Sequence, residues 1–313
     1  MTCLVCGNSP TLPTVRRERI ATMQNRIYHT RVEARQASIG NLQLNICAQC
    51  GFAYNATFDE TLLNYDSRYD NSVPSVVMTD YYKNIAAYLH GKYRVGNGLV
   101  VDIGCGKGMF LKVAAHLFPA MRGLGVDPSY ESDHDENPPS NLKFVNSVFS
   151  ANQITERPAL VVCRHVLEHI HQPIDFLKSI QSALALFPGV PFFLEVPDLL
   201  WIIKNRTFWD FCYEHCNYFT SESISHVLSV SGFTPQLIQN AFGGQYLWVE
   251  VINTPSTLQP NQASLATAAI ATTVTTLSEY VQTEANQIAS TRQILLQFKQ
   301  SGRALAVWGM STK

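Results

Sequence analysis

Charged side chains are scarce in this sequence. Asp, Glu, Lys and Arg make up only 15% of the 313 residues, and the formal net charge is -1. A disordered chain combines high charge with low hydrophobicity, whereas this one is 46% hydrophobic. A protein that holds nucleic acid through its phosphates needs a surplus of Lys and Arg. The composition therefore favours a globular protein and argues against both of those classes.

Long apolar runs are missing as well. No stretch approaches the roughly 18–20 apolar residues of a membrane-spanning helix. The first residues, MTCLVCGNSP, lack the charged segment and apolar core of a signal peptide. We therefore expect a cytoplasmic protein with no membrane partner, whose eight cysteines are thiols or metal ligands and not disulfides.

Lysine is absent from the first fifty residues, which hold six arginines and two glutamates. This bias predicts either a solvated face of a small module or an anion-binding surface.

Two cysteine pairs share one pattern, Cys3-x-x-Cys6-Gly and Cys47-x-x-Cys50-Gly. A C-x-x-C pair lets two thiolates point at one ion, and the glycine allows the tight turn behind them. Two such pairs complete a tetrahedral site. We expect one structural zinc, bound by all four cysteines, with no open position for chemistry.

Residues 99–254 alternate short apolar runs with amphipathic segments. The runs GLVVDI, MRGLGVD, LKFVNS, ALVVC and VPFFLEVP predict strands, and TPQLIQ and YLWVEVI close the region as two consecutive strands. This alternation predicts an α/β fold with a doubly wound sheet and an antiparallel edge. Residues 61–98 are expected to form a connecting helical or lid region, with a helix over 79–93.

After Thr254 the composition shifts to Ala, Thr, Ser and Gln, and residues 262–300 predict one long helix. Its apolar residues, from Ile270 to Phe298, recur every three or four positions and can pack on the chain's own body or on a second copy. Monomer and homodimer therefore both stay open. The final ALAVWG predicts the first strand of a further domain, so we expect residues 255–313 to end within a truncated C-terminal domain.

The turn after the strand at residue 99 reads Asp102-x-Gly104-x-Gly106-x-Gly108. A dinucleotide fingerprint, G-x-G-x-x-G, would need its third glycine at Met109 and fails. An acidic residue followed by three alternating glycines is instead the first motif of class I S-adenosylmethionine (SAM) methyltransferases. SAM has no pyrophosphate, and the glycines let the backbone close over its amino-acid tail.

Polar residues at the next two strand ends fit the same cofactor. Asp127 ends the second strand and is placed to accept both ribose hydroxyls, while Asp102 lies near the methionine portion. Asn146 and Ser147 end the third strand, where the adenine edge is read. We expect a class I SAM-dependent methyltransferase with a Rossmann-like sheet over residues 99–254, preceded by a zinc-binding module over residues 1–60 and followed by a C-terminal helical extension.

The whole chain resembles one family. It carries the two cysteine pairs, the SAM turn, and then V-L-E-H-I, E-V-P, E-H-x-x-Y-F and G-G-x-x-x-x-V. This set resembles the zinc-containing C-methyltransferases that act on nucleotide-activated keto-sugars in deoxysugar biosynthesis. In that family a zinc module precedes the SAM domain and a Rossmann-like domain follows, which the terminal ALAVWG resembles.

The resemblance implies a catalytic set. His169 matches the histidine of the V-L-x-H-I segment, and Glu214 and His215 match the end of a Y-H-E-H box. The box's tyrosine falls on Cys212 here, so Tyr213 is a candidate to supply the phenol from the neighbouring position. Tyr65, within NYDSRYD, resembles a lid tyrosine. Cys212 and Cys216 are expected to be packed thiols.

Carbon methylation requires a base to remove a proton next to a carbonyl and a donor to stabilise the enolate oxygen. We expect His215 to be the base, with Glu214 beside it, and Tyr213, His169 or Arg164 to be the donor. A nucleotide-sugar acceptor is the first hypothesis, and no nucleic-acid partner is expected. The rivals are an O- or N-methyltransferase on a sugar or small metabolite, a zinc-ribbon rRNA methyltransferase, and a non-catalytic scaffold that binds SAM and zinc.

Overall fold

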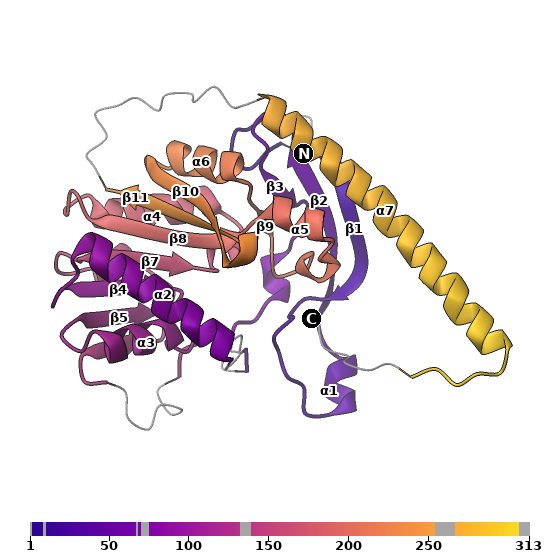
Figure 1. Ribbon diagram of the computed structural model, residues 1–313, viewed down its shortest axis with the longest axis horizontal. Helices are drawn as coiled ribbons and strands as arrows, with labels where there is room; N and C mark the ends of the chain where they lie inside the picture. The colour runs from indigo at the N-terminus through magenta and orange to yellow at the C-terminus, as the bar shows by residue number, and fades with distance from the viewer. Residues whose placement is uncertain are drawn as a thin grey trace.

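The computed structural model describes residues 2–8, 11–66, 68–69, 75–131, 139–253 and 267–306. Within them the chain builds two sheets (Figure 1), a seven-stranded one in the order β10-β11-β8-β7-β4-β5-β6 and a four-stranded one in the order β1-β2-β3-β9. The strands are β1 Thr11–Ala21, β2 Ile39–Cys47, β3 Ala53–Asn55, β4 Leu99–Ile103, β5 Arg122–Val126, β6 Leu142–Val145, β7 Leu160–Arg164, β8 Pro191–Pro197, β9 Asn217–Tyr218, β10 Pro235–Ala241 and β11 Tyr246–Ile252. The α-helices are α1 Arg31–Arg35, α2 Val76–Tyr93, α3 Met109–Leu117, α4 Pro173–Leu184, α5 Leu199–Asn205, α6 Ser221–Val230 and α7 Thr267–Gln300.

The larger sheet is mostly parallel. β4 through β8 pair in parallel, whereas β11 pairs antiparallel with both β8 and β10. β10 on the edge therefore runs in the same direction as the parallel strands. The antiparallel edge expected from the sequence is confirmed, since β10 and β11 pair antiparallel, and β11 lies between β8 and β10. A hairpin forces two consecutive strands to oppose each other but does not determine which of them is outermost.

Both faces of this sheet are covered, which explains why its strands read as continuous apolar runs. β4 and β7 are buried at all five positions. α2 and α3 pack on one face through residues such as Ile85 and Leu111, and α4 and α6 pack on the other through residues such as Leu177 and Val227. The two layers leave the carboxyl ends of β4 to β8 at one rim, where the candidate site lies.

The smaller sheet is made by two distant parts of the chain. β1, β2 and β3 come from the first fifty-five residues, while β9 follows the stretch FCYEHC and pairs antiparallel with β3. The core beneath it joins Leu42, Leu44 and Ile46 to α5 and to Leu277 of α7. This pairing fixes the N-terminal segment against the rim of the larger sheet.

Helix α7 has a packed half and an exposed half. Ile270, Leu277 and Tyr280 are buried, whereas Ile288 is 61% and Leu295 is 46% exposed. Figure 1 shows the second half extending beyond the body of the protein. The helix therefore packs on its own chain over the first half only. Of the terminal strand expected from ALAVWG, residues 304–306 form no strand and residues 307–309 lie outside the described residues.

Within the described ranges, no helix has the length and apolar character needed to cross a membrane.

Candidate active site and cysteine cluster

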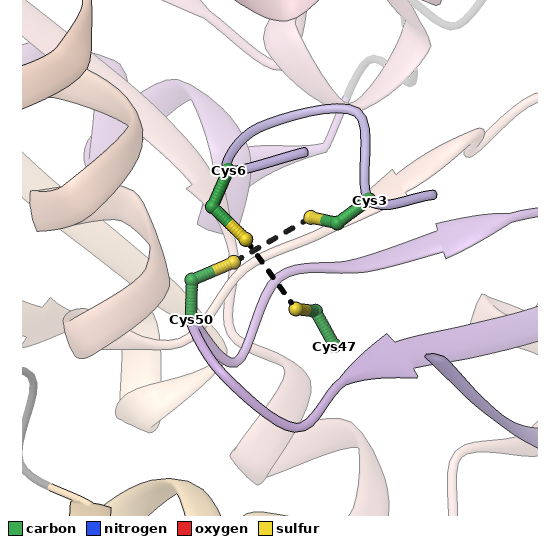
Figure 2. Close-up of side chains that lie close together, drawn as sticks. All are labelled: Cys3, Cys6, Cys47 and Cys50. Carbon is green, nitrogen blue, oxygen red and sulfur yellow. Dashed lines mark hydrogen bonds between the residues drawn. The ribbon is translucent and has the colours of Figure 1, made fainter. Parts of the chain in front are cut away.

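The four cysteines of the two C-x-x-C pairs meet at one point (Figure 2). The Sγ atoms of Cys3 and Cys50 are 3.6 Å apart, as are those of Cys6 and Cys47, and all four lie within 4.8 Å of one another. Zn–S bonds of about 2.3 Å in a tetrahedron place the sulfurs about 3.8 Å apart. The donor set and the spacing thus both fit a zinc ion.

Glycines close the turn behind each pair. Gly7 has φ +69° and Gly51 has φ +70°, a conformation that L side chains rarely adopt. Their N–H groups donate to the carbonyls of Cys3 and Cys47. The second cysteine of each pair is thereby turned back toward the first, which is why the C-x-x-C-G pattern recurs.

The glycine-rich turn follows β4 at the carboxyl rim. Gly104, Gly106 and Gly108 all have positive φ, and the Gly104 N–H donates to Val126 O at 2.8 Å. A Cβ on Gly104 would lie 2.2 Å from Val166 Cγ2. Only glycine permits both the backbone conformation and this close approach, which brings the turn against the segment that carries His169.

Asp127 stands directly after β5, as expected. Its carboxylate accepts the Gly106 N–H at 2.8 Å and the Ser129 N–H and Oγ at 2.7 and 2.6 Å. These contacts hold the carboxylate beside the glycine turn. A carboxylate has about four acceptor positions, so it retains only limited capacity for ribose hydroxyls in this arrangement.

Asp102 is buried at the end of β4, with 3% of its surface exposed. Burial raises the pKa of Asp102 to about 7, and the nearby charge of Arg164 only partly opposes it. Near neutral pH this carboxyl group is therefore poised between its two protonation states. A cationic ligand group nearby would favour the ionised form.

Asn146 and Ser147 follow β6, and both side chains have partners within the protein. The Asn146 amide donates to the Tyr130 carbonyl, and Ser147 Oγ accepts from Gln153 at 2.7 Å. The Tyr130 ring stacks on Phe144 with centroids 4.5 Å apart. This aromatic wall borders the same rim as the glycine turn.

Three of the predicted catalytic residues come together. The Tyr65 hydroxyl lies 3.1 Å from His169 Nδ1, and the His169 and His215 rings are 4.9 Å apart at 80°. His169 Nδ1 is also 3.1 Å from the carbonyl oxygen of Glu214. Burial and the charge of Glu214 raise the pKa of the Tyr65 phenol well above its usual value, so it stays protonated.

Glu214 and Tyr213 face elsewhere. The Glu214 carboxylate is buried and accepts the backbone N–H of Gln24. The Tyr213 hydroxyl accepts the Asp59 N–H at 2.8 Å and donates to the Asp59 carbonyl at 3.2 Å. The structure therefore does not bring the Tyr213 phenol to the histidines, because its hydroxyl is bound to the backbone of Asp59. Tyr213 anchors the loop at Asp59.

The two other cysteines of this stretch are buried, as expected. Cys212 is 8% and Cys216 is 2% exposed. Burial raises the pKa of both thiols, which keeps them neutral. The Cys216 thiol donates to the Glu168 carbonyl at 3.4 Å.

A chain of buried charges, which sequence reasoning missed, runs behind the histidines. Glu195 pairs with Arg164 at 2.8 Å and with His165 Nε2 at 2.8 Å, and His165 Nδ1 lies 3.5 Å from Glu168. Burial would lower the pKa of His165, but Glu168 and Glu195 outweigh it and raise that pKa to about 9. Burial alone would raise the pKa of Glu195, but Arg164 and His165 hold it at about 2.

The backbone is strained at His165, within this chain of buried charges. His165 has φ +54°, which is unusual for a residue with a side chain. The available signal was the polar run R-H-V-L-E-H at the carboxyl end of an apolar strand. Glu195, the partner of Arg164, lies 31 positions away in the sequence, so the pairing is visible only in the fold.

A family model described as "Methyltransferase domain" matches residues 78–237, just over half of the 313-residue chain. A curated relative, the mitochondrial ubiquinone biosynthesis O-methyltransferase of Schizosaccharomyces pombe, is 28% identical over 89 residues, which cover 26% of this chain and 32% of that protein. The chain thus spans about a third of that relative's length.

Solved structures of methyltransferases are similar to part of this chain at low identity. The 1,6-didemethyltoxoflavin-N1-methyltransferase of Burkholderia thailandensis, with bound S-adenosylhomocysteine, has a TM-score of 0.43 at 20% identity, over 57% of this chain and 82% of that chain. The N,N-8-amino-8-demethyl-D-riboflavin dimethyltransferase of Streptomyces davawensis has a TM-score of 0.45 at 18% identity, over 56% of each chain. Likeness at this level concerns the fold and says nothing about the acceptor.

Proposed function

The chain belongs to the methyltransferase-domain family and is a class I SAM-dependent methyltransferase, and from this premise we propose that it methylates a carbon of a nucleotide-activated keto-sugar. The observation that carries the proposal is the meeting of Tyr65, His169 and His215 at the carboxyl rim, with Val166 of the same segment against the glycine turn. A base, a proton donor and the cofactor turn then share one place.

The glycine turn and Asp102, Asp127, Asn146 and Ser147 would hold SAM, which would supply an electrophilic methyl group. The amino-acid tail carries an ammonium group, which favours the ionised form of Asp102. Ribose hydroxyls would have to share the Asp127 carboxylate with the N–H groups of Ser129 and Gly106. Asn146, whose amide donates to the Tyr130 carbonyl, and Ser147 would lie on the adenine side.

His215 removes the proton next to the acceptor's carbonyl. The electron pair of that C–H bond moves toward the carbonyl oxygen, and the resulting enolate carbon would be the nucleophile for the methyl group that bound SAM would supply. The departing thioether is neutral, so the protein's main tasks are to orient the carbon and to stabilise the enolate oxygen.

Tyr65 is the donor toward that oxygen. The Glu214 carbonyl can only accept, so its 3.1 Å contact places a proton on His169 Nδ1. That N–H also faces the Tyr65 oxygen, which leaves the phenol's own O–H directed elsewhere. A phenol that stays protonated at neutral pH suits this role, and His169 orients it.

The four clustered cysteines hold a structural zinc in this proposal. The fit rests on their 3.6 Å sulfur contacts and on the donor set. A closed four-thiolate site offers no open position, so the ion stabilises the N-terminal sheet and takes no part in methyl transfer. None of the eight cysteines, all of them within the described residues, forms a disulfide bond, so the four clustered thiols are available to bind the ion.

Methylation of oxygen is the second candidate. The similar stretch of the S. pombe O-methyltransferase favours it. The same histidine would remove a hydroxyl proton, and no enolate would form. The two candidates therefore differ in whether a carbon-bound proton exchanges with solvent.

Labelled SAM offered with pools of keto- and hydroxy-sugar nucleotides, small phenols and total RNA identifies the acceptor class. Label in a keto-sugar, together with deuterium uptake next to its carbonyl, is the expected result. Label in phenols or sugar hydroxyls without such uptake contradicts carbon methylation, and label in RNA contradicts a small-molecule acceptor.

A further inference from the structure

Glu168 carries a buried carboxylate that the protein uses only in part. The side chain is 2% exposed, and one oxygen, Oε1, faces His165 Nδ1 at 3.5 Å. The other oxygen, Oε2, is buried, and no described residue donates a hydrogen bond to it. Burying a carboxylate oxygen without compensation is costly. We therefore expect a positively charged group or ion beside Oε2 of Glu168.

Two imidazoles stand at the same place. One ring nitrogen of His169, one of His215 and one carboxylate oxygen of Glu168 all lie within 4.8 Å of one another. The two rings are nearly perpendicular, at 80°, so they converge from different directions and do not stack. Such convergence is what coordination of one ion requires.

His169 has the hydrogen bond that typically orients a metal-ligating histidine. Its Nδ1 proton is directed at the Glu214 carbonyl, 3.1 Å away, so the lone pair lies on Nε2. Histidine ligands commonly donate their second ring N–H to a backbone carbonyl in this way, which fixes the tautomer and the ring orientation.

The two segments that carry the three side chains are tied together. The Asn217 amide donates to the carbonyls of Ile170 and Leu167 at 2.6 and 3.3 Å, and the Cys216 thiol donates to that of Glu168. The turn before His169 and the stretch after His215 therefore form one rigid frame. The three donor atoms are held near one another before any ion arrives.

We propose that Glu168, His169 and His215 form a binding site for one divalent transition-metal ion, separate from the four cysteines. Bonds of 2.0–2.2 Å in a tetrahedral site bring the donors to about 3.4 Å from each other, a contraction that small side-chain rotations supply. Two imidazoles and a carboxylate suit Zn²⁺, Co²⁺ or Fe²⁺ better than Mg²⁺, which prefers oxygen donors. Three protein ligands leave a coordination position open to a small molecule at the rim.

This site goes beyond the proposed function and shares His215 with it. A histidine lone pair that binds a metal ion cannot accept a proton. The ion and the proton of the acceptor therefore compete for His215, and the site does not depend on what the acceptor is.

Cobalt titration of the full chain, with zinc already on the cysteines, tests the site. We expect a second metal ion per chain, with visible d–d bands but without the near-ultraviolet thiolate-to-cobalt band. Glu168→Gln and His215→Ala should each weaken this second ion by more than the 10–100-fold that loss of an outer-shell contact costs. His171→Ala removes a neighbouring histidine outside the group and is the matched control. It should bind as wild type does.

A single ion per chain in wild type overturns the proposal, and so does a second ion that persists in both variants. Assays of methyl transfer distinguish the metal site from the proposed role of His215 as the base. If the second ion binds and inhibits methyl transfer, the site and the base both stand. If transfer requires the second ion, the site stands and His215 is not the base. If no second ion binds while His215→Ala is inactive, the base stands and the site does not.

Discussion

At the scale of single residues, the site depends on which side of its segment each side chain faces. In Tyr213-Glu214-His215 the imidazole reaches the rim, while the phenol and the carboxylate are tied to Asp59 and Gln24. Neighbours in sequence thus have different tasks. Glu168 directly precedes His169 in the sequence, and the fold brings both residues close to His215 of another segment.

His215→Ala should reduce methyl transfer about 10²–10⁴-fold, the usual contribution of a positioned general base. Thermal stability and SAM affinity should change little, because the ring packs at the rim and not in the core. Single-turnover transfer with labelled SAM measures the loss, and His171→Ala serves as the control. Methyl transfer by His215→Ala at the wild-type rate would rule out His215 as the base and leave His169 or Tyr65 as the candidates.

Asp102→Asn should be more stabilising at pH 8 than at pH 5. The folded-state pKa of about 7 lies above the unfolded value of 3.8, so the native state binds the extra proton. Wild-type stability is therefore retained below pH 4 and lost as the pH rises through 7. Between pH 5 and 8 the wild type loses roughly 2–3 kcal/mol of unfolding free energy. The Asp102→Asn variant lacks the titrating carboxyl group and does not show this loss.

Urea unfolding of the SAM-free protein at both pH values measures that difference. SAM affinity of the variant, measured by calorimetry, should fall because the ammonium of the cofactor loses its charged neighbour. Parallel pH profiles of wild type and variant would show that Asp102 is ionised normally in the fold.

At the scale of elements, the carboxyl rim of the sheet was accessible to sequence reasoning and the buried charge chain was not. Apolar runs and the glycine pattern are local, so the strands β4 to β8 and the turn at Gly104 could be placed from the sequence. The pairing of Glu195 with Arg164 and His165 depends on β7 and β8 lying side by side. The insertion of β11 likewise depends on contacts that no local pattern records.

Gly104→Ala should destabilise the fold more than Gly96→Ala. Both glycines have positive φ, +74° and +57°, and alanine pays about 1–2 kcal/mol for that conformation. Only at Gly104 does the new Cβ also meet a side chain, at 2.2 Å from Val166, whereas the nearest atom to a Cβ on Gly96 is 3.8 Å away. Overpacking adds about 1–3 kcal/mol. Denaturant midpoints that do not differ between the variants would contradict the close approach.

The two halves of α7 should respond differently to truncation. Leu277→Ala removes a fully buried side chain and should cost about 2–5 kcal/mol of unfolding free energy. Leu295→Ala changes a side chain that is 46% exposed and should cost less than about 1 kcal/mol. Equal losses in urea unfolding would show that the second half of the helix is covered in solution, as a dimer seam would require.

At the scale of the whole molecule, one β-sheet connects the cysteine cluster to the catalytic rim. β9, two residues after His215, completes the sheet that the cysteines anchor. Disruption of the cysteine cluster should therefore also disturb the catalytic rim.

Cys47→Ser should lose the zinc ion, unfold the N-terminal sheet and lower methyl transfer together. Cys212→Ser, at another buried cysteine, should keep both the metal and the activity. Metal content per chain, limited proteolysis and turnover with labelled SAM distinguish the two variants. Full zinc retention in Cys47→Ser, or loss in Cys212→Ser instead, would reassign the ligands.

The pairing of β3 with β9 also determines an order of events during synthesis. Residues 53–55 leave the ribosome long before their partner at 217–218 exists. At about 5–20 residues per second, the gap lasts roughly 10–30 s. For that interval the nascent chain presents a strand edge with unpaired N–H and C=O groups, a template for association with other chains. Metal capture by the four early cysteines can proceed at once, and it would hold this half-built sheet in register until translation delivers the strand that closes it.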